Sequence, residues 1–229
     1  MLHGYLPSLL QGLGVTLAVA LASLVIACLL GLAGASARLS RSRVLQVIAL
    51  VYTTVIRGVP DLVMMLLVFY GGQLALNAMA LKLDHEEFID IDPFVAGVLT
   101  IGFIFGAYLS ETFRGAFLAL PSGQREAGLA YGMRRAQVLR RIELPQMLRH
   151  ALPSLSNNWL VLVKSTAIVS VIGLNDMMLK AGQAAGSTRE PFVFYGAAAL
   201  LYLAITSVSE LGFRALGQRL NVGVKAGAL

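Results

Sequence analysis

Six residues that could contact a solute lie inside otherwise apolar stretches of this chain. They are Arg57, Gly58, Asp61, Asn157, Lys164 and Ser165. A charged side chain at the centre of a bilayer costs roughly 2.5–3.5 kcal/mol on insertion scales, so ionisable residues there are rare and point to function by default. The ammonium of Lys164 is chemically suited to a carboxylate. The alternative is a structural ion pair, for which Asp61 is one candidate partner.

Arg57 and Asp61 flank a segment, Gly58-Val59-Pro60, that should interrupt a helix. Pro60 has no amide hydrogen and leaves the preceding turn without one of its hydrogen bonds. Unwound backbone inside a membrane is tolerated where it is buried in protein or lines a cavity, and broken helices mark many transport sites. Two interpretations stay open: the segment lines a path for a solute, or it is a kink held by an Arg57–Asp61 contact that serves packing alone.

No group of residues has the composition of a catalytic or metal centre. Cys28 is the only cysteine, and the three histidines, His3, His85 and His150, lie on different segments. A cysteine cluster is therefore impossible and a histidine metal site is not expected. The apolar stretches supply no Ser/His or Asp/Asp constellation, which argues against an intramembrane enzyme. The nucleotide-binding pattern G-x-x-x-x-G-K-[ST] is also missing. We expect no catalytic residue, no metal and no cofactor bound by this chain.

The overall composition is that of a membrane protein. The chain is 57% hydrophobic and 13% charged, whereas a soluble domain carries about 25% charged residues. This predicts an all-α, polytopic bundle that occupies residues 1–229 as one domain. Since about 20 apolar residues cross a bilayer as a helix, five spans are expected at about residues 9–35, 44–81, 93–113, 151–174 and 191–213. The stretch 44–81 is too long for one simple span and should be broken near 57–61.

Small residues recur four positions apart in two of these spans. Gly31 is followed by Ala35, and Gly102 by Gly106. Such pairs let two membrane helices approach closely. The sequence does not decide whether the second helix belongs to this chain or to a partner.

The positive charges are distributed unevenly between the two sides of such a bundle. Thirteen lysines and arginines fall in three segments, 38–43, 114–149 and 214–225, whereas Lys82, Lys180 and Arg189 fall on the opposite side. Cytoplasmic loops carry the excess of positive charge. The N-terminus is therefore predicted outside and the C-terminus inside. The formal net charge of +6 is explained as orientation charge, so no nucleic-acid partner is expected.

The cytoplasmic segment 114–149 is the largest loop, and its second half is strongly cationic. Residues 126–131 are able to form a helix, Gly132 permits a bend, residues 134–142 can form a second helix, and Pro145 is expected to end it. From composition alone, the loop could either lie on anionic lipid or dock on a protein.

The loop resembles a motif of known transporters. Glu126-Ala127-Gly128, three residues, Gly132, nine residues, then Ile142, Glu143, Leu144 and Pro145 is similar to the EAA loop of ABC-importer permeases. Every spacing matches, and the one departure is Gly128 where the family usually has alanine. The resemblance implies that this segment is a coupling helix that docks on an ATPase subunit, with seven residues in that role: Glu126, Ala127, Gly128, Gly132, Ile142, Leu144 and Pro145.

The resemblance covers essentially the whole chain. Segments 52–63, 106–116 and 163–173 resemble the polar amino-acid permeases, and the overall pattern is most similar to HisQ-type subunits of histidine/lysine/arginine importers. This implies a multi-pass protein of the cell inner membrane that translocates basic or polar amino acids. The implied partners are a homologous HisM-type permease, two ATPase subunits that hold ATP and Mg²⁺, a periplasmic amino-acid-binding protein, and membrane lipid.

Two alternatives remain beside this expectation. The chain could be a permease for other polar amino acids, such as glutamine. It could also be a channel outside the ABC class, which would conduct without ATP or a partner.

Overall fold

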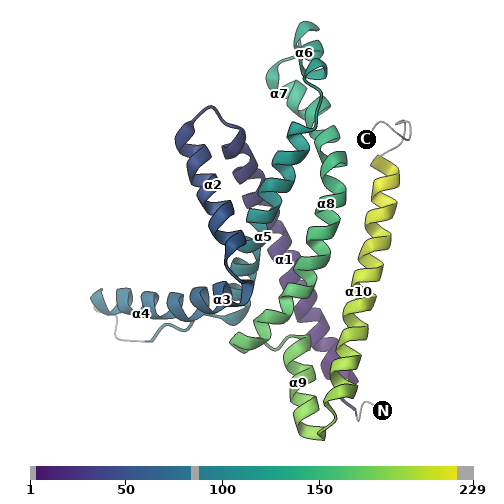
Figure 1. Cartoon of the computed structure of the whole chain (residues 1–229). Helices are drawn as coiled ribbons and strands as arrows, with labels where there is room; N and C mark the ends of the chain where they lie inside the picture. The colour runs from purple at the N-terminus through teal and green to yellow at the C-terminus, as the bar shows by residue number, and fades with distance from the viewer. Residues whose placement is uncertain (1–3, 84–87, 221–229) are drawn as a thin grey trace.

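The computed structural model describes residues 4–83 and 88–220, and within these ranges the chain forms helices and no strands (Figure 1). The helices are α1 (Leu6–Leu39), α2 (Arg43–Gly58), α3 (Asp61–Leu66), the π-helix η1 (Leu67–Gly71), α4 (Gly72–Lys82), α5 (Pro93–Leu118), α6 (Ser122–Ala130), α7 (Arg135–Val138), the π-helix η2 (Leu139–Glu143), α8 (Leu144–Ser165), the 3₁₀-helix η3 (Thr166–Ile172), α9 (Met177–Thr188) and α10 (Pro191–Leu220). Five helical stretches are long and apolar enough to cross a membrane, which confirms the predicted fold class.

The centre of the bundle is the contact between α1 and α5, and small residues make it close. A Cβ atom added to Gly31 would lie 2.7 Å from the Cβ of Leu109, and one added to Gly102 would lie 2.7 Å from the Cβ of Ile26. The buried Ser23 hydroxyl also donates a hydrogen bond to the Val98 carbonyl, at 3.2 Å. The small-residue pairs noted in the sequence therefore pack helices of this chain against each other.

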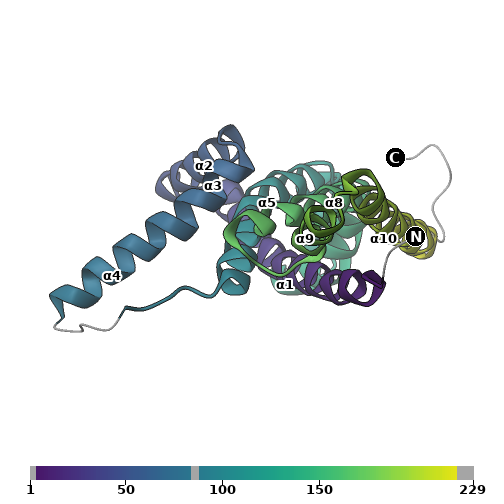
Figure 2. The same cartoon turned by 90° about the horizontal axis from the view of Figure 1, so that it is seen from below.

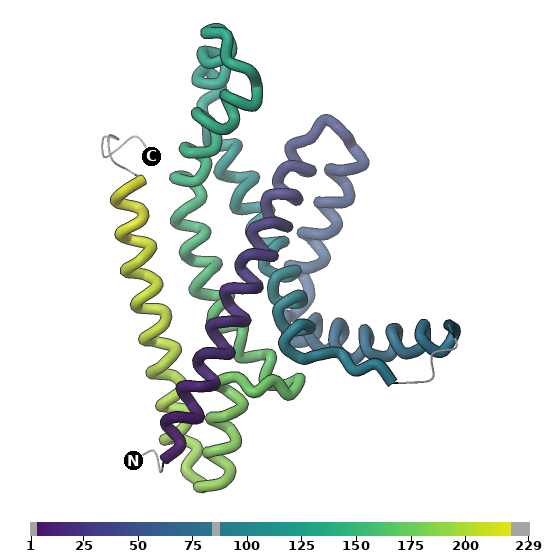
Figure 3. Tube along the Cα trace, turned by 180° about the vertical axis from the view of Figure 1, so that it is seen from behind, coloured from purple at the N-terminus to yellow at the C-terminus, as the bar shows by residue number. Residues whose placement is uncertain are grey.

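The second apolar stretch is broken where the sequence predicted. α2 ends at Gly58, Val59 and Pro60 are extended, and α3 begins at Asp61. The two halves then diverge: α2 runs along the bundle, whereas α3, η1 and α4 leave it sideways as one arm (Figures 1 and 3). Seen along the bundle, α4 extends well away from the other helices (Figure 2). The expected span 44–81 is thus a short bundle helix followed by a transverse arm.

The loop predicted to be cytoplasmic is shorter than expected, because the helices on both sides extend into it. α5 continues to Leu118 and α8 already begins at Leu144, where the sequence suggested a loop over 114–149. The expectation that Pro145 ends a helix was wrong. Pro145 lies in the first turn of α8, which continues from η2 without a break. The π-turn directly before it is the kind of local adjustment that lets a helix continue through a residue without an amide hydrogen.

At the opposite end of the bundle, α9 is held against α1. The backbone amide of Met177 donates to the Thr16 hydroxyl at 3.2 Å, and a Cβ on Gly12 would lie 2.8 Å from the Asp176 carbonyl oxygen. Asp176 is fully buried and caps α9 by accepting a hydrogen bond from the Leu179 amide at 2.9 Å. Burial raises the pKa of the Asp176 carboxyl, and the backbone hydrogen bonds oppose that shift in part.

Candidate functional site

The predicted docking loop is a helix–turn–helix that projects beyond one end of the bundle (Figures 1 and 3). Gly132 adopts a φ of +78°, a left-handed conformation that glycine adopts without steric cost. Its amide donates to the Leu129 carbonyl at 3.0 Å, and the Met133 amide donates to the Gly128 carbonyl at 3.1 Å. These hydrogen bonds terminate α6 and stabilise the turn, so the bend expected at Gly132 is present.

Gly128 lies where α6 packs on the second half of the loop. It is buried, and a Cβ there would lie 2.9 Å from Ile142 Cδ1 and 3.1 Å from Val138 Cγ2. Val138 is itself 1% exposed. Two of the motif residues, Gly128 and Ile142, therefore hold the loop together. Gly132 shapes it, while Leu144 and Pro145 join it to α8.

The outward surface of the loop carries the remaining motif residues. Glu126 and Ala127 are exposed on α6. Tyr131, at the end of α6, is 90% exposed, although the sequence analysis had not singled it out. A large exposed aromatic ring on a cationic loop is typical of a protein-docking surface. Its position directly before the turn glycine was the available signal.

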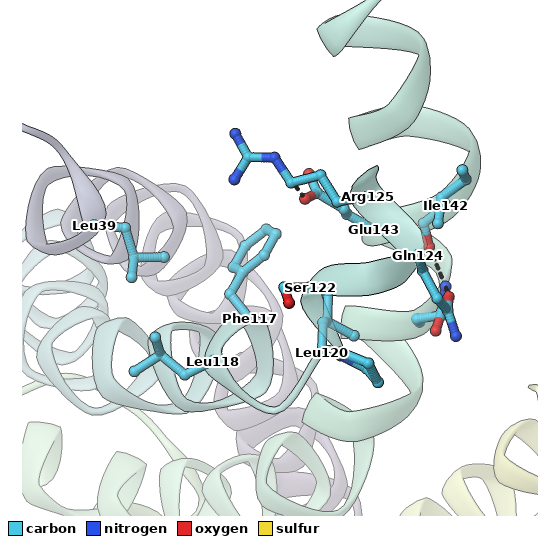
Figure 4. A pocket seen from close by; sticks show the side chains of 11 residues that line it. Leu39, Phe117, Leu118, Leu120, Ser122, Gln124, Arg125, Ile142 and Glu143 are labelled. Atoms are coloured by element: carbon cyan, nitrogen blue, oxygen red, sulfur yellow. Dashed lines mark hydrogen bonds and ion pairs between the residues drawn. The ribbon is translucent and has the colours of Figure 1, made fainter. Parts of the chain in front are cut away.

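At the base of the loop lies a cleft of about 350 Å³ between the ends of α1 and α5 on one side and the loop on the other (Figure 4). Two side-chain contacts cross from α6 to the end of η2 and the start of α8. Arg125 Nε lies 3.8 Å from Glu143 Oε1, and Gln146 Nε2 donates to Gln124 Oε1 at 2.5 Å. These contacts join α6 to the point where the second half of the loop continues into α8.

Deeper in the bundle, two helix interruptions meet. The first is the break between α2 and α3, and the second is the change from α8 to the 3₁₀-helix η3, which ends at Gly173 with a φ of +86°. The Ser165 hydroxyl donates to Asp61 Oδ2 at 3.5 Å across this meeting point. Two of the predicted path residues are thus brought together by the fold, from positions far apart in the sequence.

Three further predicted residues line two grooves that share lining residues on α2 and α5. Arg57 and Gly58 line one groove, of about 510 Å³, and Arg57 and Asn157 line its neighbour, of about 460 Å³. Both grooves include Tyr108 and Glu111. The Arg57 guanidinium lies 5.3 Å from the centre of the Tyr108 ring, within cation–π range. The Arg57–Asp61 contact of the alternative interpretation is not among the ion pairs of the described residues.

Lys164 is separate from this group. It lines a different groove, of about 630 Å³, between α8 and α10, together with Tyr202, Thr206 and Glu210. The structure therefore does not unite Lys164 with Arg57 and Asn157 in one cavity. The alternative that paired Lys164 with Asp61 is also unsupported, because Asp61 contacts Ser165 instead.

Glu111 is a charged residue of the groove that the sequence analysis did not place there. Arg114 Nη2 lies 2.8 Å from one carboxylate oxygen, and Arg38 Nε of α1 lies 3.7 Å from the other. The three-residue spacing on one helix indicates the Arg114 contact. The contact with Arg38 depends on how α1 packs against α5, which the sequence alone does not specify.

Comparison with known proteins identifies the family. Residues 27–222 match the family model described as binding-protein-dependent transport system inner membrane component. The chain is 54% identical over 226 residues to the histidine/lysine/arginine/ornithine transport system permease protein HisQ of Salmonella typhimurium, with 98% of both chains covered. It is 41% identical to the octopine transport system permease protein OccQ of Rhizobium meliloti, covering 98% of this chain and 94% of the relative.

A solved structure, described as that of an amino acid ABC transporter with histidines, has the same fold. It matches with a TM-score of 0.79 and 31% identity, covering 94% of this chain and 95% of the other. The resemblance seen in the sequence is thereby confirmed, and so is a multi-pass protein of the inner membrane. The chain belongs to the inner-membrane components of binding-protein-dependent transport systems, and within them it is a HisQ-type permease subunit.

Proposed function

We propose that this chain is one of two permease subunits of an ATP-driven importer for basic amino acids. The observation that carries the proposal is 54% identity over nearly the full length to a permease whose name gives histidine, lysine, arginine and ornithine as its substrates. A periplasmic binding protein delivers the amino acid, and a homologous HisM-type permease completes the path. Two ATPase subunits, which hold ATP and Mg²⁺, supply the energy.

The helix–turn–helix loop is the coupling element in this proposal. It projects from the end of the bundle that also holds the turn between α1 and α2 and the end of α10, with their arginines (Figure 1), so it would reach a cytoplasmic ATPase. Glu126, Ala127 and Tyr131 are exposed on it, whereas Gly128 and Ile142 pack inside it. When the ATPases close, the loop would move as one body and carry α8 with it.

The meeting of the two helix breaks is the proposed path for the amino acid. Ser165 and Asp61 contact each other there, and the neighbouring grooves add Arg57, Gly58 and Asn157. A carboxylate such as that of Asp61 would attract a cationic side chain, whereas Arg57 would attract a carboxylate. Lys164 would offer a second carboxylate site from the groove beside α10.

The test of coupling is a charge reversal at the exposed loop. Glu126→Lys should abolish ATP-driven uptake of arginine in proteoliposomes that hold the whole transporter, because it places a cation on the docking surface, while membrane insertion stays intact. Gln218→Lys is a matched control, since it adds a cation at the same end of the bundle, on α10. Full uptake and normal co-purification of the ATPase with Glu126→Lys would contradict the coupling role.

A second candidate function is that of a permease of the same family that carries other solutes. It is favoured by the 41% identity to a permease whose name gives octopine as its substrate, and glutamine is a further possibility within the polar amino acids. Competition of labelled arginine uptake by unlabelled histidine, lysine, octopine and glutamine separates these candidates. Strong competition by histidine and lysine alone supports the first proposal. A channel outside the ABC class would transport without the ATPase.

A further inference from the structure

The arm formed by α3, η1 and α4 is uncharged between Asp61 and Lys82 and exposes apolar side chains on more than one side. From Leu62 to Leu81 it carries no charged residue. Nine large hydrophobic side chains of the arm are exposed, among them Leu74 at 74%, Met79 at 64% and Leu81 at 67%, and Leu83 and Phe88 beside it bring the number to eleven. They are not confined to one face, since Leu74, Leu76, Met79 and Leu81 occupy different sides of α4. A helix of this kind is buried in protein or spans a membrane, whereas an interfacial helix has one polar face.

Residues 61–82 are long and apolar enough to cross a membrane, but the arm does not lie parallel to the other candidate spans. Its helix runs across the bundle rather than along it, and it leaves the bundle between the two ends, with α9 and the first turns of α1 and α10 extending beyond it (Figures 1 and 3). In the described residues, α4 makes substantial contacts with no helix except η1, the one that precedes it. No other helix in the described part of this chain therefore covers the exposed apolar side chains of α4.

A non-helical segment returns along the arm and indicates what covers it. Residues 88–92 are extended, and two amide side chains of the arm satisfy their backbone. The Ile91 amide donates to Gln73 Oε1 at 2.7 Å, the Ile89 amide donates to Asn77 Oδ1 at 2.8 Å, and Asn77 Nδ2 donates to the Ile89 carbonyl at 2.9 Å. Non-helical backbone at membrane depth occurs where it is buried in protein or lines a cavity, not against lipid.

We propose that the arm docks on a second permease subunit of the same fold and is the main contact between the two. The proposal rests on the proposed function, which pairs this chain with a homologous permease. Eleven exposed side chains of about 100 Å² each give on the order of 1,000 Å² of apolar surface, which reaches the roughly 800 Å² per partner of a stable interface. The uncharged surface fits a membrane-embedded partner, and in a two-fold pair each arm would reach the other bundle.

Site-directed cross-linking in the assembled transporter tests this contact. In a Cys28→Ser background, a photoactivatable benzophenone is attached to a single cysteine on the arm, introduced as Leu74→Cys in one variant and as Met79→Cys in another. Leu200→Cys and Leu211→Cys are matched controls of 68% and 64% exposure on α10, on the opposite side of the bundle (Figure 2). Both arm positions should cross-link to the second permease, and the α10 positions should not. Adducts with lipid alone from the arm, or equal yields from arm and α10, would overturn the proposal.

Truncation of the same side chains gives an independent measure. Leu74→Ala combined with Leu81→Ala should lower recovery of the second permease roughly tenfold, as expected for central interface residues, while the thermal unfolding of this chain is unchanged. Leu200→Ala with Leu211→Ala should leave recovery as in the wild type. Unchanged recovery with the arm variant would refute the docking role. Arginine uptake by the wild-type complex tests the proposed function separately from the docking of the arm. The proposed function fails if the wild-type complex does not take up arginine, whatever the arm variants do.

Discussion

Gly128 sets how closely the two halves of the docking loop approach. A side chain there meets Ile142 Cδ1 at 2.9 Å and Val138 Cγ2 at 3.1 Å, both of which are side-chain ends. The motif that the loop resembles usually has alanine at this position. A small movement of the flexible end of Ile142 can accommodate the methyl group of an alanine at position 128, but a larger side chain would separate α6 from the rest of the loop.

Gly128→Ala should therefore keep arginine uptake near the wild-type level, whereas Gly128→Leu should reduce it at least tenfold by displacing α6. Alanine also favours the helix by up to about 1 kcal/mol relative to glycine, which offsets the closer contact. Gly123→Leu is the control, because a Cβ at Gly123, on the same helix, meets no atom within 4 Å. Equal uptake by the two leucine variants would show that the packing of α6 does not matter for coupling.

Asp61 contributes a carboxylate at the point where the two helix breaks meet, and Ser165 donates to it. Asp61→Asn keeps the shape and an acceptor for Ser165 but removes the charge. If the carboxylate attracts cationic substrates, the KM for arginine should rise about tenfold, which corresponds to about 1.4 kcal/mol. Transport assays across a range of arginine concentrations measure this, and Ser165→Ala, which keeps the charge, should change KM much less. An unchanged KM in Asp61→Asn excludes a direct role in binding.

At the scale of elements, the chain uses interrupted helices rather than uniform ones. η1 and η2 are π-turns, η3 is a 3₁₀-helix, and α2 is separated from α3 by Val59 and Pro60. Interruptions of this kind occur where a helix bends or serves a site. In this chain η2 connects the loop to α8, and Ser165, which contacts Asp61, is the last residue of α8 before η3.

The cap of α9 yields a prediction about pH. Burial raises the pKa of Asp176 above its ordinary value of 3.8, so the folded state binds this proton more tightly than the unfolded state. The protonated Asp176 carboxyl then stabilises the folded state at low pH, and this stabilisation is lost as the pH rises through the folded-state pKa. Asn also caps helices and carries no charge. The free energy of unfolding of Asp176→Asn, measured relative to that of the wild type, should therefore be higher at pH 8 than at pH 5.

Thermal unfolding of the detergent-solubilised protein at these two pH values measures the difference. Asp176→Ala is the companion variant: it should be about 1 kcal/mol less stable than Asp176→Asn, because it loses the hydrogen bond to the Leu179 amide. A wild-type melting temperature that rises from pH 5 to pH 8 relative to Asp176→Asn would contradict the direction given by burial.

At the scale of the whole molecule, the bundle has two distinct ends. α6, α7 and the last turn of α10 lie at one end, with the turn between α1 and α2, whereas α9 and the start of α1 lie at the other (Figure 1). The positive-inside rule predicts that the first end is cytoplasmic. The transverse arm lies between the ends and leaves a large apolar surface for a partner.

Orientation is measured with single cysteines in a Cys28→Ser background. Gly123→Cys on α6 should react with a membrane-impermeant thiol reagent only after the cells are opened, whereas Gln183→Cys on α9 should react in spheroplasts that are still sealed. Both positions are exposed on helices. The reverse pattern would place the N-terminus inside and would rule out the proposed contact between the loop and a cytoplasmic ATPase.

The sequence by itself determined the membrane class, the break at Gly58–Pro60, the bend at Gly132 and the family. These features depend on local composition and spacing: lipid selects apolar runs of a given length, and proline and glycine act on their own backbone. Only the tertiary structure decided the contact of Asp61 with Ser165, the separation of Lys164 from Arg57, and the sideways course of residues 61–82. These depend on how helices distant in the sequence pack, and one apolar stretch can serve as a span or as an arm.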